Sequence, residues 1–191
     1  MPSKSSDFLE ELANDPQYQE MLREKETKRA AFEAELDQDE KSLVRELWDA
    51  GVDVQSVWDL VNTNTEYPNA IPILVAHLSK DHHIRTVEGI VRALTVPYAQ
   101  GIATSSLIEL FKRTDPESEL KWLLGAAIAE TATTESTAEV IRLLEDKKHG
   151  RGREYLPLAL VHLSNNEATP ILKRMLNDPI VKKNAVKAIS L

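Results

Sequence analysis

Apolar residues recur at helical spacing along most of the chain, in two runs per block of about 32 residues. The first runs of successive blocks end at Leu78, Phe111, Leu144 and Leu176. A constant period of this size is typical of helical-repeat proteins, in which each unit is a pair of helices that buries its apolar face against its neighbours. The sequence therefore predicts an all-α fold, an α-solenoid of about four helical hairpins.

An aspartate follows the end of each first run within a few residues, at Asp81, Asp115, Asp146 and Asp178. Because the chain reverses there, the carboxylate is placed to accept hydrogen bonds from the amides that open the second helix. The second runs end at Leu94, Ile128, Leu163 and Ile189. These positions place the repeats at about 68–97, 98–131, 134–164 and 165–191.

Residues 1–50 form a charged, helix-prone segment ahead of the predicted solenoid, 51–191. Asp15 followed by Pro16 is a typical N-cap and first helical position. The segment has few apolar residues, and we expect these to dock on the first repeat. Gly51 is expected to end the helical pattern.

Apolar runs on both sides of Gly51 predict a helix end and a further short helix. Asp53 is the expected cap of that short helix. Each run carries one tryptophan, Trp48 and Trp58, and the simplest interpretation places both in the core.

Three stretches, NAIPILVAHLSKD, LKWLLGAAIAETA and HGRGREYLPLAL, resemble bacterial HEAT repeats of the short variety described from phycobilisome-linker (PBS) lyases. The resemblance covers about residues 68–191. It implies a basic residue early in the second helix, a place held by Arg85, Lys121, Arg153 and Lys182 or Lys183. Most members of this family have no assigned activity, so the resemblance implies an architecture and hardly any function.

The formal net charge of −8 at pH 7 is unevenly distributed. Residues 1–50 hold 14 Asp and Glu against 7 Lys and Arg, whereas residues 142–191 hold 5 against 10. An acidic body argues against general nucleic-acid binding, which needs a basic surface. The chain has no cysteine and no long apolar run, so we expect a cytoplasmic protein without membrane contact and without a cofactor.

Second helices commonly line the concave surface of a solenoid, so their charged and aromatic residues are candidates for binding a partner. In KKHGRGR, Gly150 and Gly152 suit a turn, while the basic side chains suit an anion-binding lip; both interpretations stay open. Trp122 fits either packing between repeats or an exposed anchor. The candidate partner-binding residues are Arg85, Glu88, Arg92, Lys121, Trp122, His149, Arg151, Arg153 and Glu154.

No sequence motif points to catalysis. The pair His82 and His83 lacks a third metal ligand at suitable spacing, so neither a catalytic nor a metal site is predicted. The leading hypothesis is a protein-binding module, in one form an immunity protein that neutralises a basic toxin. The alternatives are a HEAT-fold DNA-acting enzyme similar to the alkylpurine glycosylases and a lyase-like or chaperone-like role.

Overall fold

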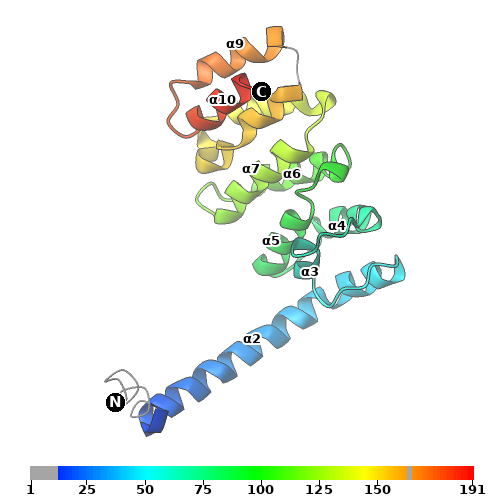
Figure 1. Ribbon diagram of the computed structural model, residues 1–191, viewed down its shortest axis with the longest axis vertical. Helices are drawn as coiled ribbons and strands as arrows, with labels where there is room; N and C mark the ends of the chain where they lie inside the picture. The colour runs from blue at the N-terminus through cyan, green and yellow to red at the C-terminus, as the bar shows by residue number, and fades with distance from the viewer. Residues whose placement is uncertain (1–12, 163–164) are drawn as a thin grey trace, which may run out of the picture. The chain divides into compact units, whose positions relative to one another are not determined.

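The computed structural model of the chain describes residues 13–162 and 165–191 (Figure 1). These residues form helices and connecting turns and contain no strand, which confirms the all-α prediction. None of the helices in the described ranges combines the length and the apolar character needed to cross a bilayer. Contacts divide the chain into two compact units, residues 1–39 and 40–191, and each is treated by itself.

The long helix α2 (Pro16–Asp49) begins in the first unit and ends in the second. At its start, Oδ1 of Asp15 accepts a hydrogen bond from the amide of Gln17 at 2.8 Å, which confirms the predicted N-cap. At its end, Gly51 adopts a φ of 81° and donates its amide to the carbonyl of Trp48. Leu163, a predicted helix end, lies outside the described residues, and the docking of the segment 1–50 stays a prediction.

The short helix α3 (Val57–Val61) begins differently from the prediction. Its N-cap is Ser56, whose hydroxyl accepts from the amide of Trp58, while Asp59 completes a capping box. Asp53 was therefore the wrong cap. The prediction that Trp48 lies in the core is wrong: its side chain is 50% exposed near the end of α2, where its Nε1–H donates to the carbonyl of Val54 at 2.6 Å.

The rest of the second unit consists of paired helices joined by short turns. The α-helices are α4 (Ile71–His77), α5 (Ile84–Ala93), α6 (Thr104–Arg113), α7 (Glu119–Thr131), α8 (Thr137–Glu145), α9 (Asn165–Met175) and α10 (Lys182–Ile189). The 3-10 helices are η1 (Pro68–Ala70), η2 (Pro97–Ala99), η3 (Thr134–Ser136), η4 (Lys147–Arg153) and η5 (Leu156–His162).

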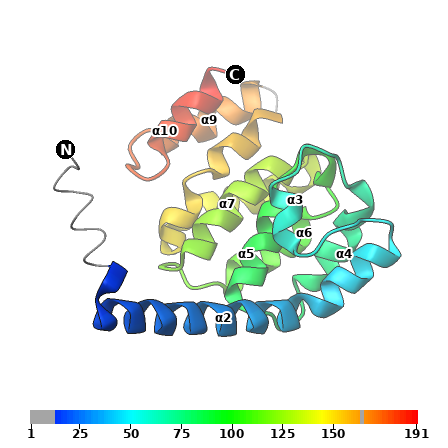
Figure 2. The same ribbon diagram turned by 60° about the horizontal axis from the view of Figure 1, so that its bottom comes forward.

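The pairs are α4 with α5, α6 with α7, α8 with η4 and η5, and α9 with α10. The second member of each pair contacts the second member of the next pair. Thus α5 packs on α7, α7 packs on η4 and η5, and η5 packs on α10. In Figures 1 and 2, α7 lies between α5 and the C-terminal elements. In the third pair the second member is a pair of 3-10 helices, and Pro157 lies in the first turn of η5, where its missing amide costs little.

Large apolar side chains from both members of each pair form one continuous core. Fully burying one such side chain stabilises the fold by about 1.5–3 kcal/mol. The predicted ends of the first runs are part of this core: Leu78, Phe111 and Leu144 are buried, and Leu176 packs against it.

Three of the four predicted turn aspartates make the same local hydrogen bond. The carboxylates of Asp115, Asp146 and Asp178 each accept from the amide two residues further on, at 2.9, 3.0 and 3.0 Å. This Asx turn reverses the chain before the second helix. As a cap of the second element, the prediction holds only for Asp146, the N-cap of η4. It is wrong for the other three, because the N-caps of α5, α7 and α10 are His83, Ser118 and Val181.

Candidate functional site

An open hollow of about 460 Å³ lies between α7, η5 and α10, which belong to the second members of three successive pairs. The end of α5 and η2 also border it. Its lining is mainly apolar, with charged side chains at the margin. The lining residues are Thr95, Pro97, Gln100, Ala126, Ala129, Glu130, Tyr155, Leu158, Val161, Lys187 and Leu191. We call this hollow, with the outer sides of α5 and α7 beside it, the second-helix face.

A cluster around Trp122 occupies the second-helix face next to the hollow. The Nε1–H of Trp122 donates to Oε2 of Glu154 at 2.8 Å, and the ring meets Tyr155 edge to face at 5.3 Å. The guanidinium of Arg151 lies 5.7 Å from the Trp122 ring centroid and 3.4 Å from a carboxylate oxygen of Glu119. Trp122 is half-buried, so the indole supports packing and still presents part of its surface to solvent.

A smaller group of the same kind lies on α5. Arg85 lies 4.5 Å above the ring of Trp58, and its Nη1 contacts Oε2 of Glu88 at 2.7 Å. Glu88 is thus paired with the residue three positions earlier on α5. Arg92 is exposed on the same side of α5. Each group thus couples a tryptophan to an arginine and a carboxylate.

Lys121 does not belong to the surface that the sequence predicted for it. It is 1% exposed, and its ammonium donates to the carbonyls of Phe111 and Thr114 at the end of α6. Burial lowers its pKa, against the opposing effect of Asp115 and Asp146. The side chain therefore satisfies the carbonyl end of the preceding helix and cannot contact a partner directly.

Arg153 is buried in the same way, at 2% exposure. Its Nη1 donates to the carbonyl of Leu144 at 3.1 Å and to Oδ2 of Asp178 at 2.8 Å. Burial by itself would raise the pKa of Asp178, but the bonds from Arg153 and from the amide of Ile180 outweigh it and lower that pKa. Arg153 thus joins the third helical pair to the fourth, and its predicted partner-binding role is incompatible with its burial.

The KKHGRGR segment is chiefly a turn. Gly150 adopts a φ of 51°, a left-handed conformation that favours glycine. Gly152 serves close packing, because a Cβ added there would lie 2.7 Å from Cγ of Lys121 and 2.9 Å from the ring of Phe111. His149 meets the Phe111 ring edge on at 4.9 Å, and burial together with Lys121 lowers its pKa. Of the three residues predicted to form the anion-binding lip, His149, Arg151 and Arg153, only Arg151 is exposed.

Two carboxylates of the second-helix face, Glu88 and Glu154, are held by arginine or indole donors, and neither shows the apolar enclosure of a catalytic acid. Within the described ranges, no group of three His, Asp or Glu side chains is arranged to hold a metal ion.

No protein-family model, curated protein or solved structure matches this chain. The function is therefore inferred from the side chains themselves.

Sequence reasoning missed the hollow and two members of the Trp122 cluster, Glu119 and Tyr155. Ala126 and Ala129 were not singled out, although they follow Trp122 at intervals of four and three residues on one side of α7. That spacing was a usable signal, since it continues the side of the helix that carries the exposed edge of the indole.

Proposed function

We propose that this chain is a short HEAT-like solenoid that acts as a non-enzymatic protein-binding module through its second-helix face. The observation that carries the proposal is the hollow shared by α7, η5 and α10. Exposed apolar hollows bordered by polar side chains mark interaction sites, and a groove between successive helices suits an amphipathic segment of a partner. Ala126 and Ala129 keep side-chain bulk low, so a partner backbone can approach closely.

The Trp122 cluster supplies the kind of contact that dominates protein interfaces. Tryptophan, tyrosine and arginine are the residue types enriched among energetically important interface positions. Here Trp122, Tyr155 and Arg151 lie together at the hollow, where Trp122 contacts the Tyr155 ring and Glu154 contacts both the indole and the guanidinium. Because the carboxylate fixes the indole before binding, little side-chain entropy is lost on association.

The partner we propose is a basic protein, in one form a toxin that this chain neutralises as an immunity protein. The net charge of −8 supports this, since an acidic surface attracts a basic partner and speeds association. The alternative of a DNA-acting enzyme is weakened by the burial of Lys121 and Arg153, because two basic side chains expected on this face are not available to phosphates.

The test uses two arginine substitutions on opposite sides of the helical pairs. Ala129→Arg places a long cation in the hollow, whereas Ser105→Arg adds the same charge to the exposed side of α6. Partners captured by tagged wild-type protein from its host would be identified by mass spectrometry, purified and titrated against all three proteins. We expect Ala129→Arg to weaken binding by about tenfold or more and Ser105→Arg to leave it unchanged.

Two results would contradict the proposal. One is equal binding by wild type and by a correctly folded Ala129→Arg protein, which would place the interface elsewhere. The other is the absence of any reproducible partner for wild type. The charge argument has its own check, since affinity for a basic partner must fall as salt rises.

A further inference from the structure

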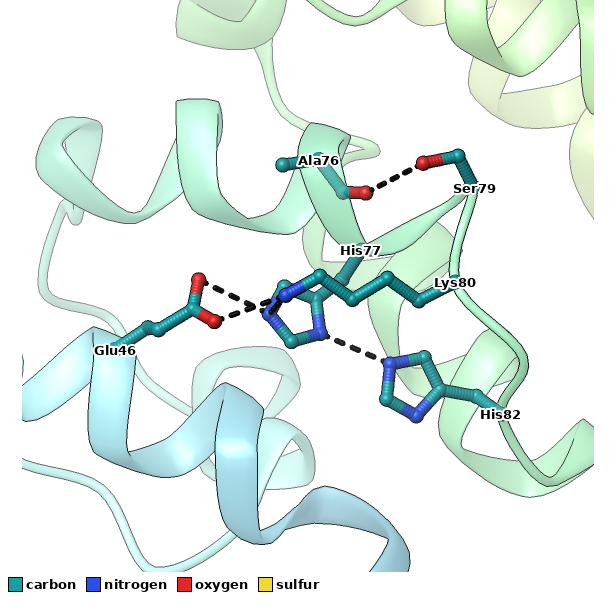
Figure 3. A network of polar contacts seen from close by, with 6 residues as sticks. All are labelled: Glu46, Ala76, His77, Ser79, Lys80 and His82. Carbon is teal, nitrogen blue, oxygen red and sulfur yellow. Dashed lines mark hydrogen bonds and ion pairs between the residues drawn. The ribbon is translucent and has the colours of Figure 1, made fainter.

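Four titratable side chains form a row at the turn between α4 and α5. His77, the last residue of α4, is fully buried, and its Nδ1 lies 2.9 Å from Nε2 of His82 (Figure 3). Its Nε2 lies 2.7 Å from the ammonium of Lys80 and 3.2 Å from a carboxylate oxygen of Glu46 on α2. Lys80 also contacts Glu46 at 2.9 Å.

The hydrogen-bonding capacity of these groups fixes their protonation. The lysine ammonium has only donors, so Nε2 of His77 must accept from Lys80. The ring proton of His77 then resides on Nδ1 and is donated to Nε2 of His82. The row of hydrogen bonds therefore holds only while both imidazoles are neutral.

A proton added at either ring breaks the row. On Nε2 of His82 it would bring two donors face to face at 2.9 Å. On Nε2 of His77 it would place a buried imidazolium 2.7 Å from the ammonium of Lys80, with the single carboxylate of Glu46 beside both cations. Burial lowers the pKa of His77 and Lys80 lowers it further, against the opposing effect of the Glu46 bond, so the folded turn favours the neutral ring.

A third imidazole at this turn also acts as an acceptor. His83 is the N-cap of α5, and its Nδ1 accepts from the amide of Arg85 at 3.2 Å. Protonation removes that acceptor and leaves the amide without its cap. The turn and its neighbours also carry Asp81, Arg85 and, from α6, Arg113, whose Nη2 donates to the carbonyl of Leu78 at 2.9 Å.

We propose that the turn between α4 and α5 is an acid-sensitive switch, in which protonation of His77, His82 and His83 opens the turn and frees the first turn of α5. The free segment would include Arg85, which otherwise lies on the Trp58 ring. An effect on partner binding through Arg85 rests on the proposed function. The opening itself does not, and it can be measured without any partner.

The experiment is amide hydrogen exchange of the full chain at about pH 7.5 and about pH 5.5, on either side of the usual histidine titration. After correction for intrinsic rates, we expect protection of the amides of 79–87 to fall by about tenfold or more at the lower pH, because the turn opens locally. The amides of 120–131 in α7 serve as the internal reference. An equal fall in both segments, or none in 79–87, would overturn the proposal.

A double variant, His82→Gln with His83→Asn, tests the cause. The amide oxygens keep an uncharged acceptor at each place, so the pH response of 79–87 should fall to the part that His77 contributes. His149→Gln, at a different turn, is the matched control and should leave that response intact. A double variant as acid-sensitive as wild type would overturn the proposal. So would an NMR spectrum of wild type at neutral pH that shows the His77 ring proton on Nε2.

Discussion

The second and third helical pairs each place a buried cation against the carbonyl end of the preceding helix, but they use different residues. In the second pair, the Lys121 ammonium bonds the carbonyls of Phe111 and Thr114, both at the end of α6. In the third, Arg153 bonds the carbonyl of Leu144 and also the carboxylate of Asp178, which belongs to the next pair. Lys121 therefore makes these bonds within the second pair, whereas Arg153 links the third pair to the fourth.

The difference lies in the acceptors. Each cation makes its two bonds from one nitrogen, Nζ of Lys121 or Nη1 of Arg153, but one acceptor of Arg153 is a carboxylate, and a hydrogen bond between two charged groups is the stronger kind. An ammonium is a compact charge, and in the apolar surroundings of Lys121 burial lowers its pKa. Removal of each cation should therefore have a different cost, and the comparison can be tested by substitution.

The largest effect is expected from Arg153→Leu. Asp178 would keep its charge in a site where its carboxylate is 13% exposed, and breaking a buried ion pair from one side costs about 3 kcal/mol or more. Urea unfolding should show this loss in the free energy of unfolding. The control adds Asp178→Asn, which removes the unpaired charge and should recover part of the loss. A cost below about 1 kcal/mol for the single variant would mean that Arg153 does not join the pairs.

Lys121→Met should cost less, about 1–2 kcal/mol. The substitution leaves two carbonyls without their donor, but it also removes a cation whose desolvation opposes folding. The same urea titration measures it. A loss of stability equal to that of Arg153→Leu would show that the two cations do not differ in their contribution. A gain in stability would show that the bonds to the two carbonyls do not offset the desolvation of the Lys121 ammonium.

Arg151→Ala should have the smallest effect on stability, within about 0.5 kcal/mol. Its guanidinium is 61% exposed, and its ion pairs with Glu119 and Glu154 are long, at 3.4 and 3.9 Å. Thermal unfolding would check this against Arg153→Leu, two residues away. A large loss of stability would show that the Trp122 cluster is part of the core and not part of a binding face.

Regular local signals were predictable from the sequence. The period of the apolar runs indicated the helical pairs, Asp15 and Gly51 marked the ends of α2, and Asp115, Asp146 and Asp178 were correctly placed at turns. These features depend on hydrogen bonds between residues close in the chain, so a short stretch of sequence is enough to predict them.

The candidate site was less predictable, because burial depends on what packs from elsewhere. Lys121 and Arg153 have the sequence signature of exposed charges, and Trp48 that of a core residue, yet their exposures are reversed. The row of Glu46, His77, Lys80 and His82 joins α2 to a turn more than 30 residues away.

The sequence by itself thus determined the helical character of the chain, the pairing of its helices and most of its turns, since these follow from short-range periodicity and local hydrogen bonds. Only the tertiary structure decided which charges are buried, which of the tryptophans lies in a cluster at the surface, and where three second elements leave an apolar hollow. Those outcomes require atoms from separate helices to meet. A one-dimensional pattern does not specify such distances.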